Sequence, residues 1–300
     1  MTPNAVEIDG LWKKFGRFDA VSGLSMSVPE GAAFALIGPN GAGKTTTIKT
    51  AMNIIGPDRG SVTVLGVDSR QLAADDFTKI GYVSENQDLP GGLTVAQFLA
   101  YLRPFYPTWD RELEGALLGW SQLPPDRRIR NLSHGMRVKL ALTAALAFRP
   151  KLLVLDEPFN GLDALVREEF MELLLGEAGE TTLLISSHDL GDIQGVATHV
   201  GFIDQGKLLF QESMEELSAR VREVNVTLEG DAVLPRHPPE NWLDLKTTGS
   251  VVSFVDVRFD EARLRDRAAA VLGPVRRIDI RPVELRAIFT TIARSIRKEA

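Results

Sequence analysis

The stretch that decides the fold reads Gly38-Pro39-Asn40-Gly41-Ala42-Gly43-Lys44-Thr45, followed by Thr46. It fits the pattern G-x-x-x-x-G-K-[ST], between an apolar run, Ala33–Ile37, and a helical segment that begins at Lys44. Glycines at this spacing let backbone N–H groups converge on phosphate oxygens, and a helix N-terminus adds partial positive charge. Lys44 would then reach the β- and γ-phosphates of ATP, and Thr45 would ligate Mg²⁺. The stretch predicts a nucleotide-binding α/β fold; a glycine-rich turn without a ligand is the alternative.

Acidic and imidazole side chains follow two other predicted strands. Leu152–Leu155 is a continuous apolar run that ends in Asp156 and Glu157. A Mg²⁺-nucleotide site needs such a carboxylate, so we assign Asp156 to the metal and Glu157 to an attacking water as general base. His188 follows the strand Thr182–Ser186, at the edge where ligands collect in open α/β sheets, and a neutral imidazole there would hydrogen-bond the γ-phosphate. Alone, a strand that ends in Asp-Glu is weak evidence; together with the phosphate loop it is strong.

The composition excludes several kinds of site. The chain has 300 residues and no cysteine, which removes disulfides, thiolate zinc sites, iron-sulfur clusters and thiol nucleophiles. A net charge of −6 argues against nucleic acid as a partner. Met1–Gly10 lacks a basic-then-apolar stretch, so we expect no secretory signal. The longest apolar run, Leu140–Phe148, is far shorter than the roughly 20 residues of a spanning helix, so a membrane role would act through a partner.

The first two thirds of the chain alternate β-rich runs with amphipathic helical segments, a pattern typical of an α/β sheet with crossover helices. The predicted buried strands are Ala33–Ile37, Lys79–Val83, Leu152–Leu155, Thr182–Ser186 and Val200–Ile203. Val6–Ile8 and Leu24–Val28 indicate a small antiparallel β part before them. Proline breaks indicate a helix-rich insert at about residues 93–150. We therefore predict a first domain over residues 1–221.

The character of the chain changes after Val221. The predicted strands are Asn225–Leu228, Val251–Val257 and Val275–Ile280, and the predicted helices are Asp260–Leu272 and Pro282–Ile296. A stretch containing Pro and Gly, Gly230–Pro239, separates them from the first domain. Residues 222–300 are therefore predicted to form a small C-terminal α+β accessory domain.

A further motif carries a specific resemblance. Leu132-Ser133-His134-Gly135-Met136 stands just before a strongly helical run, Arg137–Phe148. It resembles the signature sequence of ATP-binding cassette (ABC) proteins, usually L-S-G-G-Q. The other family motifs occur in the expected order and spacing between about residues 6 and 219: the phosphate loop, Asp156-Glu157, Asn160-Gly161-Leu162-Asp163 and His188. The chain therefore resembles the ATP-binding subunit of an ABC transporter, with a P-loop NTPase core.

The resemblance implies how these parts act. Two such domains pair head to tail, so that Ser133 and Gly135 of one chain would face the γ-phosphate of ATP held by Lys44 of the other. Hydrolysis removes the bridging charge and lets the two halves separate. Asp163 is in the position of the family's D-loop aspartate and would couple the two sites. Phe15 matches the aromatic residue that stacks on adenine, with a packed core Phe as the alternative.

Two motifs depart from the family pattern. His134 replaces the first signature glycine and Met136 the glutamine, while the serine and the second glycine remain. We expect retuned affinity at most. At the position of the Q-loop glutamine the chain has Glu85, and a glutamine appears only at Gln87. A carboxylate can contact Mg²⁺ through water, so Glu85 is a candidate metal residue, with Gln87 as the alternative.

The segment Phe105–Asp110 and the C-terminal appendage resemble those of the ATPase subunits of bacterial ABC-2-type exporters. In these exporters the ATPase is a separate polypeptide. The resemblance implies a cytoplasmic ATPase, peripheral on the inner face of the membrane, that binds a transmembrane permease and forms a homodimer or heterodimer with another cassette subunit. One alternative is an ATPase of DNA repair or the ribosome, but such proteins carry two cassettes or a long coiled coil, and this sequence shows neither. A second alternative, an ATP sensor without turnover, predicts loss of the base, yet Glu157 is present.

Overall fold

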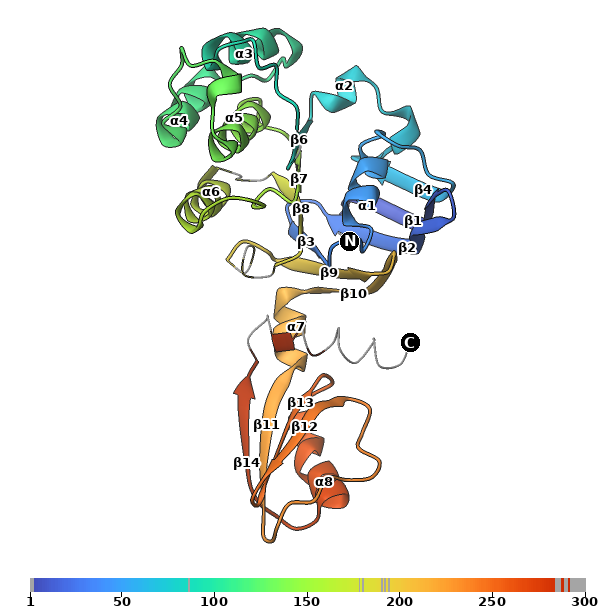
Figure 1. Ribbon diagram of the computed structural model, residues 1–300. Coiled ribbons are helices and arrows are strands. Elements are labelled where there is room, and N and C mark those ends of the chain that lie inside the picture. The colour runs from blue at the N-terminus through green and yellow to red at the C-terminus, as the bar shows by residue number, and fades with distance from the viewer. Residues whose placement is uncertain are drawn as a thin grey trace. The chain divides into compact units, whose positions relative to one another are not determined.

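The computed structural model describes residues 3–85, 87–177, 179, 181–189, 191, 193, 195–283, 287, 288 and 291. The chain forms two compact units, Met1–Gln211 and Glu212–Ala300 (Figure 1). The sequence places the boundary after Val221, and the functional separation of the two parts stays a prediction. Among the described residues, no helix is long and apolar enough to cross a bilayer.

A six-stranded sheet forms the centre of the first unit, with the strand order β10-β9-β3-β8-β7-β6. Its strands are β3 (Ala33–Ile37), β6 (Ile80–Ser84), β7 (Leu152–Asp156), β8 (Thr182–Ser187), β9 (His199–Asp204) and β10 (Lys207–Ser213). Neighbours from β9 to β6 pair in parallel. The five buried strands agree with the predictions to within a residue at either end, because continuous apolar runs are the mark of strands covered on both faces. β10 was not predicted.

Helices cover both faces of this sheet. Figure 1 shows α1 (Lys44–Ala51) on one side and α5 (His134–Leu146) and α6 (Ala164–Glu177) on the other. The predicted helix Thr94–Tyr106 is shorter: α3 spans Val95–Leu102, and a 3₁₀ turn follows at Arg103–Phe105, because Pro104 cannot donate the next helical hydrogen bond. α5 begins three residues before the predicted start at Arg137, so His134, Gly135 and Met136 of the signature motif lie in the first turn of the helix.

The rest of the insert packs beside α5. α4 (Arg111–Ser121) begins after Asp110, whose side chain accepts from the N–H groups of Glu112 and Leu113, as expected of an N-cap. A short helix, α2 (Ala74–Phe77), precedes β6. The insert has its own apolar cluster, which includes Leu99, Ile129 and Leu140.

An antiparallel sheet with the order β2-β1-β4-β5 precedes the main sheet. Its strands are β1 (Asn4–Phe15), β2 (Phe18–Pro29), β4 (Arg59–Val64) and β5 (Val67–Asp68). The predicted pair Val6–Ile8 and Leu24–Val28 is present, but the observed strands β1 and β2 are much longer than the predicted ranges. β4 and β5 were not predicted. One reason is that β1 and β2 contain several register shifts, which break the regular alternation that sequence patterns detect.

The second unit is α+β, as predicted. A four-stranded antiparallel sheet has the order β12-β13-β11-β14. Its elements are α7 (Met214–Arg220), β11 (Arg222–Leu228), β12 (Trp242–Thr248), β13 (Val251–Asp256), α8 (Glu261–Leu272) and β14 (Val275–Pro282). β12 was missed, although Trp242 anchors the core by stacking on Phe254. Most of the predicted helix Pro282–Ile296 lies outside the described residues.

Candidate nucleotide-binding site

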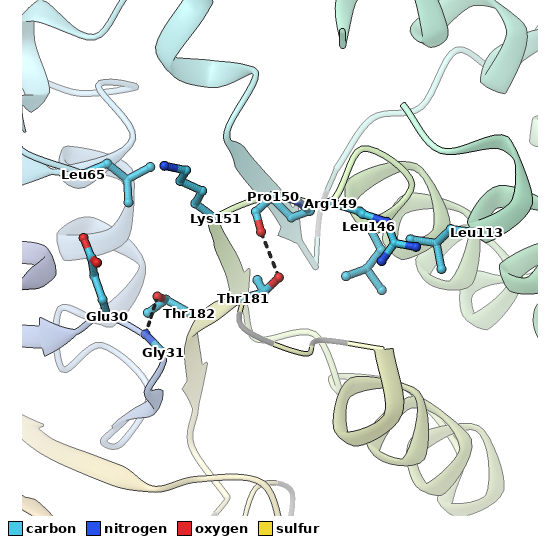
Figure 2. Close-up of a pocket in the computed structure, with 10 residues that line it drawn as sticks. All are labelled: Glu30, Gly31, Leu65, Leu113, Leu146, Arg149, Pro150, Lys151, Thr181 and Thr182. Carbon is cyan, nitrogen blue, oxygen red and sulfur yellow. Dashed lines mark hydrogen bonds between the residues drawn. The ribbon is translucent and has the colours of Figure 1, made fainter. Parts of the chain in front are cut away.

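A cleft of about 360 Å³ opens at the carboxyl ends of β3 and β7. Its lining comes from the tip of the β1–β2 hairpin, the phosphate loop, the end of β6 and the loop after β7: Phe15, Phe18, Ala20, Asn40, Gly41, Ala42, Gly43, Lys44, Thr45, Thr46, Glu85, Glu157 and Asn160. Open α/β sheets bind ligands at this edge. A larger cavity of about 530 Å³ lies at the opposite edge, where Glu30, Lys151 and Thr182 precede or begin strands (Figure 2).

Several polar groups of the cavity in Figure 2 already have partners, and the cavity lies away from the strand ends at which open α/β sheets bind ligands. The Thr181 hydroxyl donates to the carbonyl of Pro150, and the N–H of Gly31 donates to the hydroxyl of Thr182. Arg149 forms an ion pair with Asp110. The cleft at the carboxyl edge is therefore the candidate site.

The phosphate loop is shaped by its glycines. Gly43 has φ +108° and stands at the N-cap of α1, where no side chain among the described residues caps the helix. The first N–H groups of α1 are thus left to a ligand. A Cβ at Gly38 would lie 2.1 Å from the carbonyl oxygen of Ile203, and one at Gly43 would lie 2.5 Å from that of Ala20. Neither position can hold a side chain without moving the backbone.

Lys44 lies under this loop with only 4% of its surface exposed. Its ammonium group donates to the carbonyl oxygens of Gly38 and Pro39, at 2.7 and 3.1 Å. The third partner is Glu157 Oε1, at 3.0 Å. A buried ammonium with one anionic partner is well placed to exchange that partner for a phosphate oxygen.

Asp156, the last residue of β7, is joined to the phosphate loop. Its Oδ1 accepts from Thr45 Oγ1 at 3.0 Å and from Ser186 Oγ at 2.7 Å. Burial raises the pKa of this carboxyl above its ordinary value, although both hydrogen bonds act in the opposite direction. A desolvated carboxylate beside a threonine hydroxyl is a donor set suited to a hard cation.

Glu157 follows in the left-handed region, with φ +51°, which turns the chain out of the sheet. Its N–H donates to Ser186 Oγ at 2.9 Å. Its second carboxylate oxygen contacts His188 Nδ1 at 2.8 Å, while the first holds Lys44. The structure thus brings the three predicted catalytic and phosphate-binding side chains into one cluster.

The structure bears on two choices that the sequence left open: whether Phe15 is a core residue, and whether Glu85 or Gln87 lies at the cleft. Phe15 is 52% exposed and lines the cleft, so it is not a core residue. Glu85 lines the same cleft, and its N–H donates to the carbonyl of Asp156 at 3.1 Å. Gln87 instead lines a separate cavity beside Phe98 and Ala141.

The signature residues and Asp163 lie outside the cleft, at the starts of α5 and α6. Ser133 is the N-cap of α5 and accepts from the N–H of Met136, and a Cβ added at Gly135 would lie 3.7 Å from the Leu162 side chain. Asp163 accepts from the N–H of Val166 at the start of α6. None of the three signature and D-loop residues Ser133, Gly135 and Asp163 is among the described residues that line the cleft.

Several residues of the site escaped the sequence analysis. Ser186 joins Asp156 to the backbone of Glu157, and its position at the end of a predicted strand beside His188 was the available signal. Phe18 lies directly across the hairpin from Phe15 and is 61% exposed. Asn160 reaches the cleft from a motif that had been assigned only to coupling.

Comparison with known proteins agrees with this geometry. Residues 21–160 match the family model described as ABC transporter. The bacitracin transport ATP-binding protein BcrA of Enterococcus faecalis is 32% identical over 72% of this chain and 72% of its own length. The lantibiotic transport ATP-binding protein SrtF of Streptococcus pyogenes is 31% identical over 71% of this chain and 95% of its own length.

Solved structures share the fold. An ATP-binding subunit of an ABC transporter superposes with a TM-score of 0.66 at 24% identity, covering 72% of this chain and 92% of that one. A dimeric ATP-binding cassette in a post-hydrolysis state with ADP and Pi gives a TM-score of 0.61 at 23% identity, over 70% and 98% of the two chains.

Fold and site define a P-loop nucleoside triphosphatase of the cassette type. The chain belongs to the ABC transporter family of ATP-binding proteins, which confirms the resemblance, the fold class and the assignment as an ATPase subunit. Members of this family bind nucleotide, dimerise and work with transmembrane permease subunits.

Proposed function

We propose that this chain binds Mg²⁺-ATP in the cleft and hydrolyses it, and that Glu157 is the general base. The observation that supports this most directly is the cluster in which Glu157 contacts both Lys44 and His188 at the end of the phosphate loop. A γ-phosphate that enters the loop competes for Lys44. It thereby frees one carboxylate oxygen of Glu157 for a water molecule.

Each neighbouring group has a distinct task in this proposal. Thr45 and Asp156 would hold Mg²⁺, because their oxygens already lie 3.0 Å apart at the loop. The cation, when bound, neutralises charge on the β- and γ-phosphates. Glu85 would contact it through water. His188 keeps Glu157 oriented and would hydrogen-bond the γ-phosphate through its imidazole. Phe15 supplies an exposed aromatic face for adenine.

We further propose that catalysis takes two cassettes. In the single chain, Ser133 and Gly135 stand at the N-terminus of α5, outside the cleft. A helix N-terminus whose first residues include a serine cap and a glycine is a natural anion site. It would meet the γ-phosphate held by Lys44 of a second cassette, with Asp163 near the contact. The second cassette is either a copy of this chain or a related subunit.

The partner in the membrane is proposed to be a separate permease of an exporter. Two similar proteins carry bacitracin transport and lantibiotic transport in their names, and both are ATP-binding proteins. Because no described helix spans a bilayer, a transport role needs such a partner. The subunit would then lie in the cytoplasm on the inner face of the membrane. A net charge of −6 supports a protein partner over nucleic acid.

Glu157→Gln tests the enzymatic part of the proposal. Removal of a general base lowers turnover by roughly 10²–10⁴-fold while the phosphate loop stays intact. The variant should therefore bind ATP and accumulate as a dimer on gel filtration with Mg²⁺-ATP. A variant that stays monomeric with saturating ATP would contradict the paired-cassette proposal. Turnover close to that of the wild type would remove Glu157 from the role of base.

The transport part is tested by purification of the tagged chain from detergent-solubilised membranes of its own host. A polytopic membrane protein at near-equal stoichiometry is the expected result. Lys44→Ala is the matched control, because it should lose ATP while keeping the surfaces that contact a permease. Recovery with ribosomal or DNA-associated proteins in the soluble fraction would overturn the transporter role and leave the ATPase chemistry standing.

A further inference from the structure

His134 makes a contact that the usual signature glycine cannot make. Its Nε2 lies 3.0 Å from the carbonyl oxygen of Asn160, across 26 residues of sequence. The imidazole also covers Gly161, where an added Cβ would lie 3.4 Å from the ring. A neutral histidine protonated at Nε2 donates this hydrogen bond, because a carbonyl oxygen can only accept. The first turn of α5 is thus attached to the loop that follows β7.

The loop that His134 holds also carries the catalytic carboxylate. The N–H of Asn160 donates to the carbonyl of Glu157 at 3.3 Å, which closes a turn between the two residues. Asn160 and Glu157 both line the nucleotide cleft. Glu157 is the first residue of this turn and has φ +51°, and its side chain contacts Lys44 and His188. A displacement of the Asn160 carbonyl therefore moves the turn and, with it, the Glu157 carboxylate.

We propose that His134 is a positioning residue that couples the two ATP sites of a cassette pair. The inference rests on the proposed function, in which the N-terminus of α5 contacts ATP held by the other cassette. Ser133, at that N-terminus, immediately precedes His134, and the hydrogen bond from His134 then continues to the turn of Glu157 in the chain's own cleft. ATP in the partner cleft thereby stabilises the turn that positions the base in this one. Such coupling is reciprocal between equivalent sites.

The test compares His134→Ala with His134→Gln and with a matched control, His199→Ala. His199 contacts Thr198 at the start of β9, so the control removes an imidazole outside the signature helix. Steady-state ATPase assays on the wild type should give a Hill coefficient above about 1, the sign of coupled sites. His134→Ala should bring that coefficient to about 1 and lower kcat roughly fivefold, the effect of one lost hydrogen bond.

Other readouts separate positioning from binding. Affinity of the monomeric chain for a fluorescent ATP analogue should be unchanged in His134→Ala, because the residue does not line its own cleft. His134→Gln, which can donate from a side-chain amide, should recover most of the cooperativity. Gly161→Ala perturbs the same contact from the other side, since its Cβ meets the ring at 3.4 Å and the residue has φ +70°. It should reproduce the loss without altering His134 itself.

Two results would overturn the inference and leave the proposed function intact. One is a His134→Ala enzyme with the Hill coefficient and kcat of the wild type. The other is an equal loss in His199→Ala, which would show that the effect is not specific to this contact. A wild-type chain that binds ATP and never turns it over would instead overturn the proposed function, and the inference with it. The two failures are distinguishable because the first leaves wild-type turnover intact.

Discussion

Asp156→Asn should make the ligand-free chain more stable while it removes the response to Mg²⁺. Asp156 is 4% exposed, and its Oδ1 accepts from both Thr45 and Ser186. Asparagine has a carbonyl oxygen that can take the place of Oδ1, so both hydrogen bonds survive. The substitution therefore deletes a buried charge and changes little else.

The magnitude follows from two opposing effects. Hydrogen bonds to a neutral oxygen are each weaker than bonds to a charged one by about 1 kcal/mol, so the variant loses about 2 kcal/mol. A carboxylate withdrawn from water carries a penalty of several kcal/mol, which the amide avoids. The net gain in the free energy of unfolding is about 1–2 kcal/mol. For a unit of this size that raises the Tm by roughly 2–8 °C.

The dependence on pH gives a second, independent signature. Burial holds the pKa of Asp156 in the folded chain above its ordinary value of 3.8. The folded state therefore binds the proton more tightly than the unfolded state does. Wild-type stability contributed by this group falls as pH rises from about 3.8 through the folded-state pKa and is constant above it. The advantage of Asp156→Asn should appear over the same interval.

Thermal and urea unfolding between acidic and neutral pH measure this directly, with Asp163→Asn as the matched control. Asp163 is exposed, and asparagine caps a helix as well as aspartate does, so the control should be neutral. Addition of Mg²⁺-ATP should raise the Tm of the wild type by a large amount and that of Asp156→Asn by little. A variant that is less stable than the wild type at neutral pH would refute the reasoning, as would a stability difference that does not change with pH.

Four further substitutions test the remaining groups. Phe15→Ala should weaken ATP affinity roughly tenfold by equilibrium titration and leave kcat at saturation unchanged, because stacking contributes ~1–3 kcal/mol per base. Glu114→Ala should lower the free energy of unfolding in urea by about 2–4 kcal/mol, because it removes the buried carboxylate whose oxygens accept from Arg103 Nε and Nη2 at 2.9 and 2.5 Å. A variant as stable as the wild type would show that the pair does not stabilise the fold. Glu85→Ala should lower Mg²⁺-dependent turnover roughly 10–100-fold and Gln87→Ala should not; the reverse order would reassign the Q-loop role.

Much of the cluster at the edge of the sheet could be predicted because its parts are local. The phosphate loop, the apolar strand that ends at Asp156 and the strand before His188 each read as a short motif in the chain. In a parallel sheet, strands with buried faces place their carboxyl ends at one edge, so three separate motifs converge there without any knowledge of long-range contacts. The bounds of β3 were predicted without error because the strand is a continuous apolar run that ends at the first glycine of the phosphate loop.

The elements that the sequence analysis missed lack a local signal. β12 carries Asp244 with φ +50° inside a register shift, so its alternation is broken. β4 and β5 gain their order from pairing with β1 and with each other rather than from apolar runs. Their propensities are too weak to specify strands alone.

The sequence by itself indicated the family, predicted the nucleotide chemistry and identified the residues at the edge of the sheet, because backbone geometry and apolar periodicity act over a few residues at a time. Only the tertiary structure decided that Glu85 rather than Gln87 lines the cleft, that Ser186 joins the two acidic residues, and that His134 reaches Asn160. Each of these depends on the packing of segments distant in the chain. A hydrogen bond across 26 or 30 residues leaves no periodicity in the sequence to reveal it.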